Sequence, residues 1–303
     1  MHRAFVFNIQ RFCIHDGEGI RTTFFFMGCA LNCLWCHNPE GRDFRPQLIL
    51  QDERCRGCGA CVEACSDDCI SLDDGTATTD RSRCTACGKC VESCPFMARE
   101  ITGRLYSVEE LVRIAARDRI FHETSGGGVT LSGGEAMLQD PGFLLELVSE
   151  LKRQGFHIAI DTCGDAPYDA FSALLPYVDC FLYDIKLMDS ELHRLYTGND
   201  NQRILTNLVR LSQAGATLHV RIPLIEGVNA SDAAIDPILA FLHENVRVQR
   251  ISLLPCHPMG WDKRRLLGQT GHATSFTAPD AERMEAIADR FRKAGWTNVQ
   301  IGG

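Results

Sequence analysis

The sequence lacks a long hydrophobic run and an excess of positive charge. Residues 1–8 contain no sustained apolar core followed by a small-residue cleavage site, so no signal peptide is expected and the cytoplasm is the expected location. The 303 residues carry 31 Lys and Arg against 39 Asp and Glu, a formal net charge of −8, which disfavours non-specific binding to nucleic acid or an anionic membrane. Hydrophobic residues make up 45 % and charged residues 23 %, an ordinary globular composition that argues against disorder and against a membrane-spanning segment.

Cysteine, in contrast, is abundant. Eleven of the 16 cysteines fall into three short runs in the first third of the chain, which indicates metal sites in a reducing compartment rather than a disulfide framework. In the first run, Cys29, Cys33 and Cys36 are spaced C-x3-C-x2-C directly after the apolar residues 22–27, so this loop leaves the end of an expected strand. Thiolates select zinc or iron–sulfur clusters. Zinc would need a fourth ligand, which His37 could supply, whereas an iron–sulfur cube held by three cysteines keeps one iron open to an outside ligand.

The second and third cysteine runs both have the spacing C-x2-C-x2-C-x3-C, which is that of bacterial ferredoxins. In ferredoxins the fourth cysteine of each run binds the cluster of the other run. We therefore expect one [4Fe–4S] cluster on Cys55, Cys58, Cys61 and Cys94, and another on Cys84, Cys87, Cys90 and Cys65. A pair of zinc ribbons is less favoured, because zinc sites pair two C-x2-C units instead of placing four thiols in one run. The sequence thus predicts an inserted ferredoxin-like domain at residues 51–101.

The sequence leaves two candidates for one of the crossing ligands. Cys65 is followed by Ser66, where ferredoxin runs usually have proline, and Cys69 lies four residues further on. The spacing favours Cys65. Without a proline to fix the backbone, however, the loop could bring in Cys69 instead, which is otherwise a free thiol.

The rest of the chain, residues 1–50 and 102–303, alternates strand-like and helix-like segments. Strands are expected at residues 22–27, 129–132, 156–160, 180–185, 217–224 and 250–254. Helices are expected at 107–123, where Ser107 and Glu110 form a capping box, at 141–154, at 168–175, between 190 and 214, and after each of the last two strands. Six strand–helix units with right-handed crossovers predict an α/β fold, a partial (β/α)6 barrel.

Polar residues gather where these strands end. The carboxyl ends of parallel barrel strands lie on one face, and that face carries the site in such enzymes. Asp184 and Lys186 are two residues apart, so both are expected on the same side of the chain, where they could hold the opposite charges of an amino acid zwitterion. A solvated surface pair is the alternative.

Several stretches extend beyond the cysteine runs. They are DGEGIR at 16–21, the cysteine loop ending in WCHNP at 35–39, SGGE at 132–135, DTCG at 161–164, DIK at 184–186 and LPCHPMG at 254–260. Together they resemble the glycyl-radical-enzyme activating enzymes of the radical S-adenosylmethionine (SAM) superfamily, over essentially the whole chain. The chain is similar to the pyruvate formate-lyase activating enzymes, while its two-cluster insert more resembles activators of lyases acting on aromatic, polyol or amine substrates. Glu18 stands where this family usually has proline.

The resemblance implies three [4Fe–4S] clusters and SAM as cofactors. In such an oxidoreductase, SAM binds the open iron and an electron from the reduced cluster cleaves its S–C5′ bond. The products are methionine and a 5′-deoxyadenosyl radical, which takes a hydrogen from one backbone glycine of a partner glycyl radical enzyme. Flavodoxin or ferredoxin is the implied electron donor. The two clusters of the insert would pass electrons inward or store one, and an anchoring or partner-docking role of the insert is the alternative.

The resemblance also implies a set of SAM-binding residues. The two glycines of this set would let the backbone approach the methionine part, and His257 would bond to the adenosine part. Asp161 and Thr162 would orient SAM, through a monovalent cation, and Arg221 at the end of the fifth strand would meet a carboxylate. The full set is Trp35, Cys36, His37, Gly133, Gly134, Glu135, Asp161, Thr162, Asp184, Ile185, Lys186, Arg221 and His257.

Two other functions are alternatives to the activation of a glycyl radical enzyme. A radical SAM enzyme acting on a free small molecule is disfavoured by the motif at 16–21 and by the open-barrel length. A non-enzymatic electron carrier built on the insert would not cleave SAM. The remaining thiols have no partner at metal spacing and are expected to be buried small hydrophobes, namely Cys13, Cys163, Cys180 and Cys256.

Overall fold

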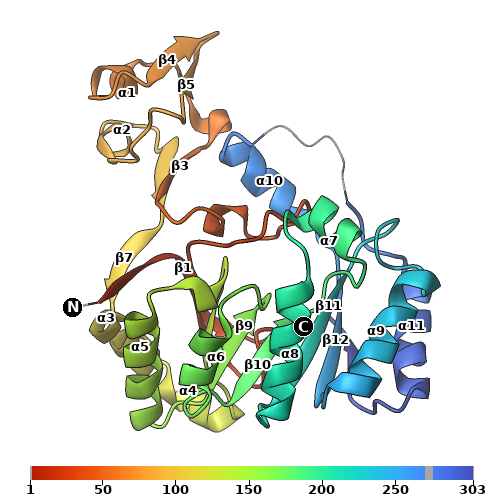
Figure 1. The fold of residues 1–303 in the computed structure, drawn as a ribbon. Helices are drawn as coiled ribbons and strands as arrows, with labels where there is room; N and C mark the ends of the chain where they lie inside the picture. Colours follow the sequence, from red (N-terminus) through yellow and green to blue (C-terminus); the bar gives the residue numbers. More distant parts are fainter. Residues whose placement is uncertain (1, 270–275, 303) are drawn as a thin grey trace.

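The main sheet of the computed structural model, which describes residues 2–269 and 276–302, has nine strands (Figure 1). Six of them are parallel neighbours along the sheet: β2 (Arg21–Phe26), β8 (Gly128–Gly133), β9 (Ile158–Thr162), β10 (Cys180–Asp184), β11 (Leu218–Leu224) and β12 (Arg250–Pro255). These are the six strands that the sequence predicts, so the partial (β/α)6 barrel is confirmed.

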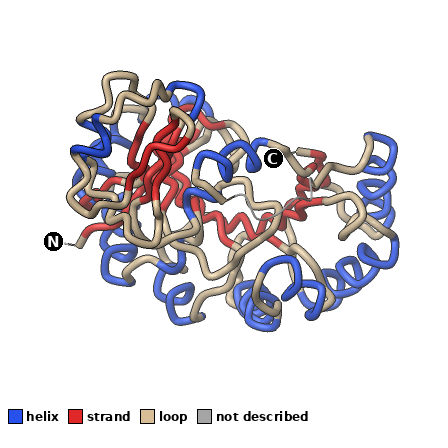
Figure 2. Tube along the Cα trace, turned by 90° about the horizontal axis from the view of Figure 1, so that it is seen from above, coloured by secondary structure: helices blue, strands red, loops and turns tan. Residues whose placement is uncertain are grey.

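Three further strands extend this sheet. β1 (Arg3–Cys13) lies antiparallel to β2, and β7 (Arg104–Ser107) lies antiparallel to β1. At the other end, β13 (Val299–Ile301) pairs in parallel with β12. In the described chain β7 and β13 are the two ends of the sheet and do not pair with each other, so the barrel stays open. The strands follow an arc, with most helices on its outer side (Figure 2).

The helices connect the strands as the sequence predicts, with one difference. They are α3 (Val108–Ala116), α4 (Arg119–Ser125), α5 (Pro141–Arg153), α6 (Tyr168–Leu174), α7 (Ser190–Thr197), α8 (Gln202–Gln213), α9 (Asp232–Asn245), α10 (Met259–Leu266) and α11 (Ala281–Lys293). The Ser107–Glu110 capping box is confirmed. The single helix expected at 107–123 is wrong, because the chain breaks at Asp118. The buried Asp118 carboxylate accepts from Arg11 and from Thr22 Oγ1 (2.8 Å), which holds this point of the chain against the sheet.

The core lies between the sheet and its covering helices. Ile158 and Ile160 of β9 have no exposed surface, and neither do Phe143 and Leu147 of α5. Strands buried on both faces are typical of parallel sheets with helical crossovers. No helix of the described residues is long and apolar enough to cross a membrane.

The cysteine-rich segment forms a separate lobe above the sheet, next to α10 (Figure 1). Strands β3 (Gln47–Leu50) and β6 (Arg99–Thr102) pair with each other, as do β4 (Ile70–Asp73) and β5 (Thr76–Thr79). Two short helices, α1 (Ala60–Glu63) and α2 (Lys89–Glu92), begin after Gly59 and Gly88, whose φ angles are +80° and +85°. Cys84 follows Cys55 by 29 residues, and the same offset relates α1 to α2, β3 to β5 and β4 to β6. The lobe is therefore an internal repeat in structure as well as in sequence.

Candidate active site

The loop that carries Cys29, Cys33 and Cys36 starts directly after β2, at the carboxyl end of the parallel strands. Its backbone is tied to α7, because Asn32 N donates to Thr197 O (2.6 Å) and Leu34 N donates to Tyr196 O (2.9 Å). The three thiols therefore sit on one short, fixed loop at the barrel mouth.

These thiols fit a cubane better than a single ion. In the part of the chain that the structure describes, no three His, Cys, Asp or Glu side chains are close enough to share one metal ion. A [4Fe–4S] cluster does not need such convergence, because each cysteine binds a different iron. Burial raises the pKa of the Cys33 thiol to about 12, so its thiolate form requires a bound cation.

Gly133 and Gly134 end β8 beside this loop. Gly133 has a φ of +117°, and a Cβ at Gly134 would lie 2.3 Å from Gly41 O and 2.5 Å from Gly28 O. Backbone of β2 and of the cysteine loop thus fills the space next to both glycines. Their lack of a side chain is required by this packing, whatever they contact in a ligand.

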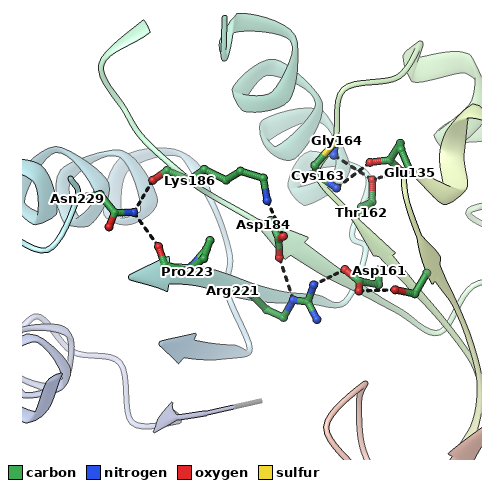
Figure 3. A network of polar contacts seen from close by, with 11 residues as sticks. Glu135, Asp161, Thr162, Cys163, Gly164, Asp184, Lys186, Arg221, Pro223 and Asn229 are labelled. Atoms are coloured by element: carbon green, nitrogen blue, oxygen red, sulfur yellow. Dashed lines mark hydrogen bonds and ion pairs between the residues drawn. The ribbon is translucent and has the colours of Figure 1, made fainter. Parts of the chain in front are cut away.

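Glu135 holds the ends of β8 and β9 together (Figure 3). It is 1 % exposed and accepts from Thr162 Oγ1 (2.7 Å), Cys163 N (2.8 Å) and Met137 N (3.0 Å). Burial raises the pKa of Glu135 above its usual value. The structure therefore brings Glu135 and Thr162 together, but their polar atoms are occupied by protein groups.

Four charged side chains form a row across the barrel (Figure 3). Arg221 binds Asp161 and, through Nε, Asp184 Oδ1 (2.9 Å), while Lys186 Nζ binds the other oxygen of Asp184 (2.8 Å). Ser132 Oγ donates to Asp161 Oδ2 (2.7 Å). The four charged side chains are only 11 to 16 % exposed, so this is not the solvated surface pair that the sequence left as an alternative.

The electrostatics of this row follow from burial and pairing. Burial raises the pKa of Asp161 to about 6, although Arg221 acts against it. Burial also acts to raise the pKa of Asp184, but the charges of Arg221 and Lys186 outweigh it and the pKa is lowered. For Lys186 burial acts to lower the pKa, and the charge of Asp184 turns the net shift upward. Lys186 and Asp184 are therefore a charged pair at neutral pH.

The position of Arg221 differs from the prediction. β11 continues to Leu224, so Arg221 lies inside the strand instead of at its end, and the strand register places it opposite Asp184. Ile185 is buried and takes part through its backbone, since its N–H donates to Arg221 O (2.9 Å). Asn229, which the sequence does not predict as a site residue, donates to Lys186 O (2.8 Å) and Pro223 O (2.7 Å) and fixes the loop after β10 (Figure 3). No motif marks Asn229, and only its complete burial distinguishes it.

Aromatic side chains of the cysteine loop, Trp35 and His37, contact residues from other parts of the chain. The rings of His37 and His257 are 6.0 Å apart between centroids. Trp35 packs against Tyr196 and Phe276, each at 5.8 Å, and these two aromatic partners carry no sequence motif. The structure thus brings His257, from the far end of the chain, to the mouth that the other predicted residues form.

The motif at 16–21 lies at the opposite, amino end of β2. Arg21 is fully buried and donates to Thr130 Oγ1 and Val129 O, both at 2.6 Å. Glu18, which replaces the usual proline, forms an ion pair with Arg250 at the start of β12 (2.7 Å). The unusual residue therefore has a structural partner across the open barrel.

The cysteines of the lobe line two small, separate hollows. The first is lined by Cys55, Cys58, Cys61 and Cys94, and the second by Cys65, Cys69, Cys84, Cys87 and Cys90. The structure thus groups the cysteines in the crossed pattern that the spacing predicts, with one thiol too many in the second group.

The extra thiol in the second group is either Cys65 or Cys69, whose sulfur atoms are 3.4 Å apart. At the offset of 29 residues, Cys65 corresponds to Cys94 and Cys69 corresponds to Ala98. Ala98 is 2 % exposed and Cys69 is 5 % exposed, so Cys69 occupies the place of a buried small residue in the other half.

The remaining cysteines only partly follow the prediction. All 16 cysteines lie in the described residues, and each is a free thiol. Cys163 and Cys180 are buried as expected, whereas Cys13 and Cys256 are partly exposed, so for these two the prediction is wrong. Cys13 stands in the last position of β1, and Cys256 directly follows β12, and strand ends are less well covered than strand centres.

Comparisons with known proteins agree with this geometry. Residues 81–236 match the model of the radical SAM superfamily, and residues 54–98 match that of the 4Fe-4S dicluster domain. The first match begins after the Cys29–Cys36 loop, which lies before the inserted lobe.

Relatives match over nearly the full length. The trans-4-hydroxy-L-proline dehydratase activating enzyme of Clostridioides difficile is 44 % identical over 300 residues, 98 % of this chain and 99 % of that protein. The choline trimethylamine-lyase activating enzyme of Oleidesulfovibrio alaskensis is 38 % identical over 95 % of this chain and 96 % of its own length. A solved domain of a pyruvate-formate lyase-activating enzyme from Bacteroides vulgatus is 31 % identical, with a TM-score of 0.50 over 59 % of this chain and all of that domain. The chain therefore belongs to the glycyl-radical-enzyme activating enzymes of the radical SAM superfamily.

Proposed function

We propose that Cys29, Cys33 and Cys36 hold the [4Fe–4S] cluster at which SAM is reductively cleaved, and that this mouth serves a partner glycyl radical enzyme. The observation that carries the proposal is the position of this loop near Lys186 and Asp184, whose charges act on Cys33, in the row that also includes Asp161 and Arg221. When bound, the cluster supplies the electron that breaks the S–C5′ bond of SAM.

The residues of the row fit the charged ends of an amino acid. Lys186 and Arg221 are the cations available to a carboxylate, and Asp184 is the anion available to an ammonium group. His257, in the turn between β12 and α10, and Trp35 of the cysteine loop would bind the adenosine part. The row is neutral, with two charges of each sign. The carboxylate and the ammonium group of SAM would therefore exchange places with side chains of like charge, and this exchange would orient SAM.

A monovalent cation would bind near Asp161 and Thr162. Arg221 already contacts Asp161, and the Thr162 hydroxyl donates to Glu135, so a cation there would share these oxygens with protein partners. We propose that the cation enters together with the negative charge of the SAM carboxylate.

The lobe would hold two more clusters, three in the whole protein, and would receive electrons from a flavodoxin or ferredoxin. Its cysteine groups line separate hollows, and it lies against α10, which also contacts the cysteine loop (Figure 1). A [4Fe–4S] cluster contains four irons, so anaerobically reconstituted protein should contain about twelve irons per chain. Iron analysis that gives about four would reject the two additional clusters.

The partner would be a glycyl radical enzyme, as the names of the relatives indicate for those proteins. Free thiols throughout the chain suit a reducing compartment such as the cytoplasm. The test of the proposed function is to incubate reduced, reconstituted protein with SAM and to measure 5′-deoxyadenosine and methionine. Formation of both in equal amounts is expected, whereas intact SAM beside a reduced cluster would contradict the proposal.

Exchanging Arg221 for methionine should destabilise the protein strongly. The change leaves the buried Asp161 and Asp184 without their shared partner, and breaking a buried ion pair in this way costs roughly 3–5 kcal/mol. The measurement is anaerobic urea unfolding of the cluster-loaded protein. Arg113→Met is the control, because Arg113 pairs with Glu109 on the surface of α3 and an exposed pair contributes about 0.5 kcal/mol. Equal losses in the two variants would contradict the importance of the row.

A further inference from the structure

Arg264 on α10 is a buried cation that has no carboxylate partner among the residues that the structure describes. It is 3 % exposed, and none of the ion pairs found among the described residues includes it. Its neighbour Arg265 is 49 % exposed in the side chain and pairs with Glu53 at 3.4 Å, as a surface arginine usually does. A buried guanidinium costs free energy unless a negative group compensates it. Arg264 therefore requires a source of negative charge other than Asp or Glu.

The cysteine loop is next to this guanidinium. Arg264 Nη2 donates to the carbonyl oxygen of Cys33 at 2.6 Å. Burial lowers the pKa of Arg264, and the charge of Arg42 acts in the same direction. Cys36 and Cys33 act in the opposite direction. The guanidinium therefore lies against the loop that carries the proposed cluster ligands.

The helix that carries Arg264 is fixed on two sides. A Cβ on Gly260 would lie 2.3 Å from Cys36 O, so the start of α10 packs directly on the cysteine loop. Lys263 binds Glu40 (2.7 Å), and Arg81 of the lobe donates to Leu266 O (3.2 Å). The guanidinium is therefore held in place from both the loop and the lobe, in agreement with the position of α10 between them (Figure 1).

We propose that Arg264 is a positioning residue that raises the reduction potential of the cluster held by Cys29, Cys33 and Cys36. This inference rests on the proposed function. One electron from the external donor makes the cluster more negative by one charge, so a fixed cation stabilises the reduced form more than the oxidised form. Net charge and hydrogen bonds near the ligands are known determinants of cluster potentials.

The test is an anaerobic redox titration of the reconstituted full-length protein, followed by electron paramagnetic resonance. The signal of the three-cysteine cluster is recognised by its change when SAM is added. In Arg264→Met we expect the ratio of reduced to oxidised cluster at a fixed potential to fall about tenfold, which corresponds to about 59 mV for one electron. Arg264→Lys, which keeps the charge, should retain most of the wild-type potential. Arg265→Met is the matched control and should leave it unchanged.

Iron content and thermal unfolding of each variant show whether the loop is intact. If Arg264→Met does not load its cluster, Arg264→Gln serves in its place, because it keeps an N–H donor for Cys33 O and removes only the charge. A wild-type potential in a loaded Arg264→Met or Arg264→Gln variant would overturn the inference. Absence of the SAM-sensitive signal in the wild-type protein would instead refute the proposed function itself.

Discussion

Alanine in place of Cys29, Cys33 or Cys36 is expected to abolish SAM cleavage. Each thiol is proposed to bind one iron of the cube, and with only two ligands left on a short loop the cluster is not retained. The loop itself should keep its position, because it is tied to α7 by backbone hydrogen bonds that these substitutions do not touch. The measurement is 5′-deoxyadenosine formation by reduced protein, together with iron content.

Cys180→Ala is the matched control for these three variants. Cys180 is also a buried thiol, but it stands at the amino end of β10, away from the mouth. The Cys180→Ala variant should cleave SAM at the wild-type rate. SAM cleavage that survives in Cys33→Ala, or is lost equally in Cys180→Ala, would show that the chemistry does not depend on the C-x3-C-x2-C loop.

The second large effect concerns the crossing ligand of the lobe. Cys65→Ala is expected to lose one cluster, about four irons, whereas Cys69→Ala should lose none. The internal repeat supports this assignment, because Cys65 matches the proposed ligand Cys94 in position, and Cys69 matches the buried Ala98. Cys69→Ala thus gives the lobe the residue that its other half already has.

Iron analysis of the two variants, prepared and reconstituted side by side, decides between the thiols. Their sulfur atoms are 3.4 Å apart, so Cys69 is close enough to serve if Cys65 does not. Full iron in Cys65→Ala together with loss in Cys69→Ala would reverse the assignment. When they are reduced chemically, both variants should still cleave SAM at the cluster of Cys29, Cys33 and Cys36. Neither Cys65 nor Cys69 belongs to the loop that holds this cluster.

The parallel strands and the mouth were predictable from sequence because each rests on a local pattern. Apolar runs ending in polar residues identified β2 and the five strands from β8 to β12, and their common direction brought Asp184 and His257 to one face. The sequence pattern does not predict β1, although Ala4 and Val6 alternate in burial with their neighbours as strand residues do, because an antiparallel strand has no place in a strictly repeating strand–helix pattern.

The sequence does not predict which side chains pair with one another inside the site. The resemblance implies that Glu135 faces SAM, but its oxygens accept from the Thr162 hydroxyl and from the backbone N–H groups of Cys163 and Met137, which depends on the spacing of strand ends. Arg221 was placed at a strand end, whereas the register of β10 and β11 puts it opposite Asp184. Arg264 stands in an unremarkable basic run, and only the packing of α10 on the cysteine loop distinguishes it from Arg265.

The central claim is that one hydrogen atom moves at this mouth from a partner's glycine to the 5′-deoxyadenosyl radical formed from SAM, which gives 5′-deoxyadenosine. The direct measurement uses a candidate glycyl radical enzyme labelled with deuterium at the glycine α-carbon, incubated with SAM, reductant and the reconstituted protein. The account predicts a glycyl radical signal on the partner and one deuterium in the 5′-deoxyadenosine. Cleavage of SAM that leaves every cognate partner without a radical, and 5′-deoxyadenosine without deuterium, would contradict it.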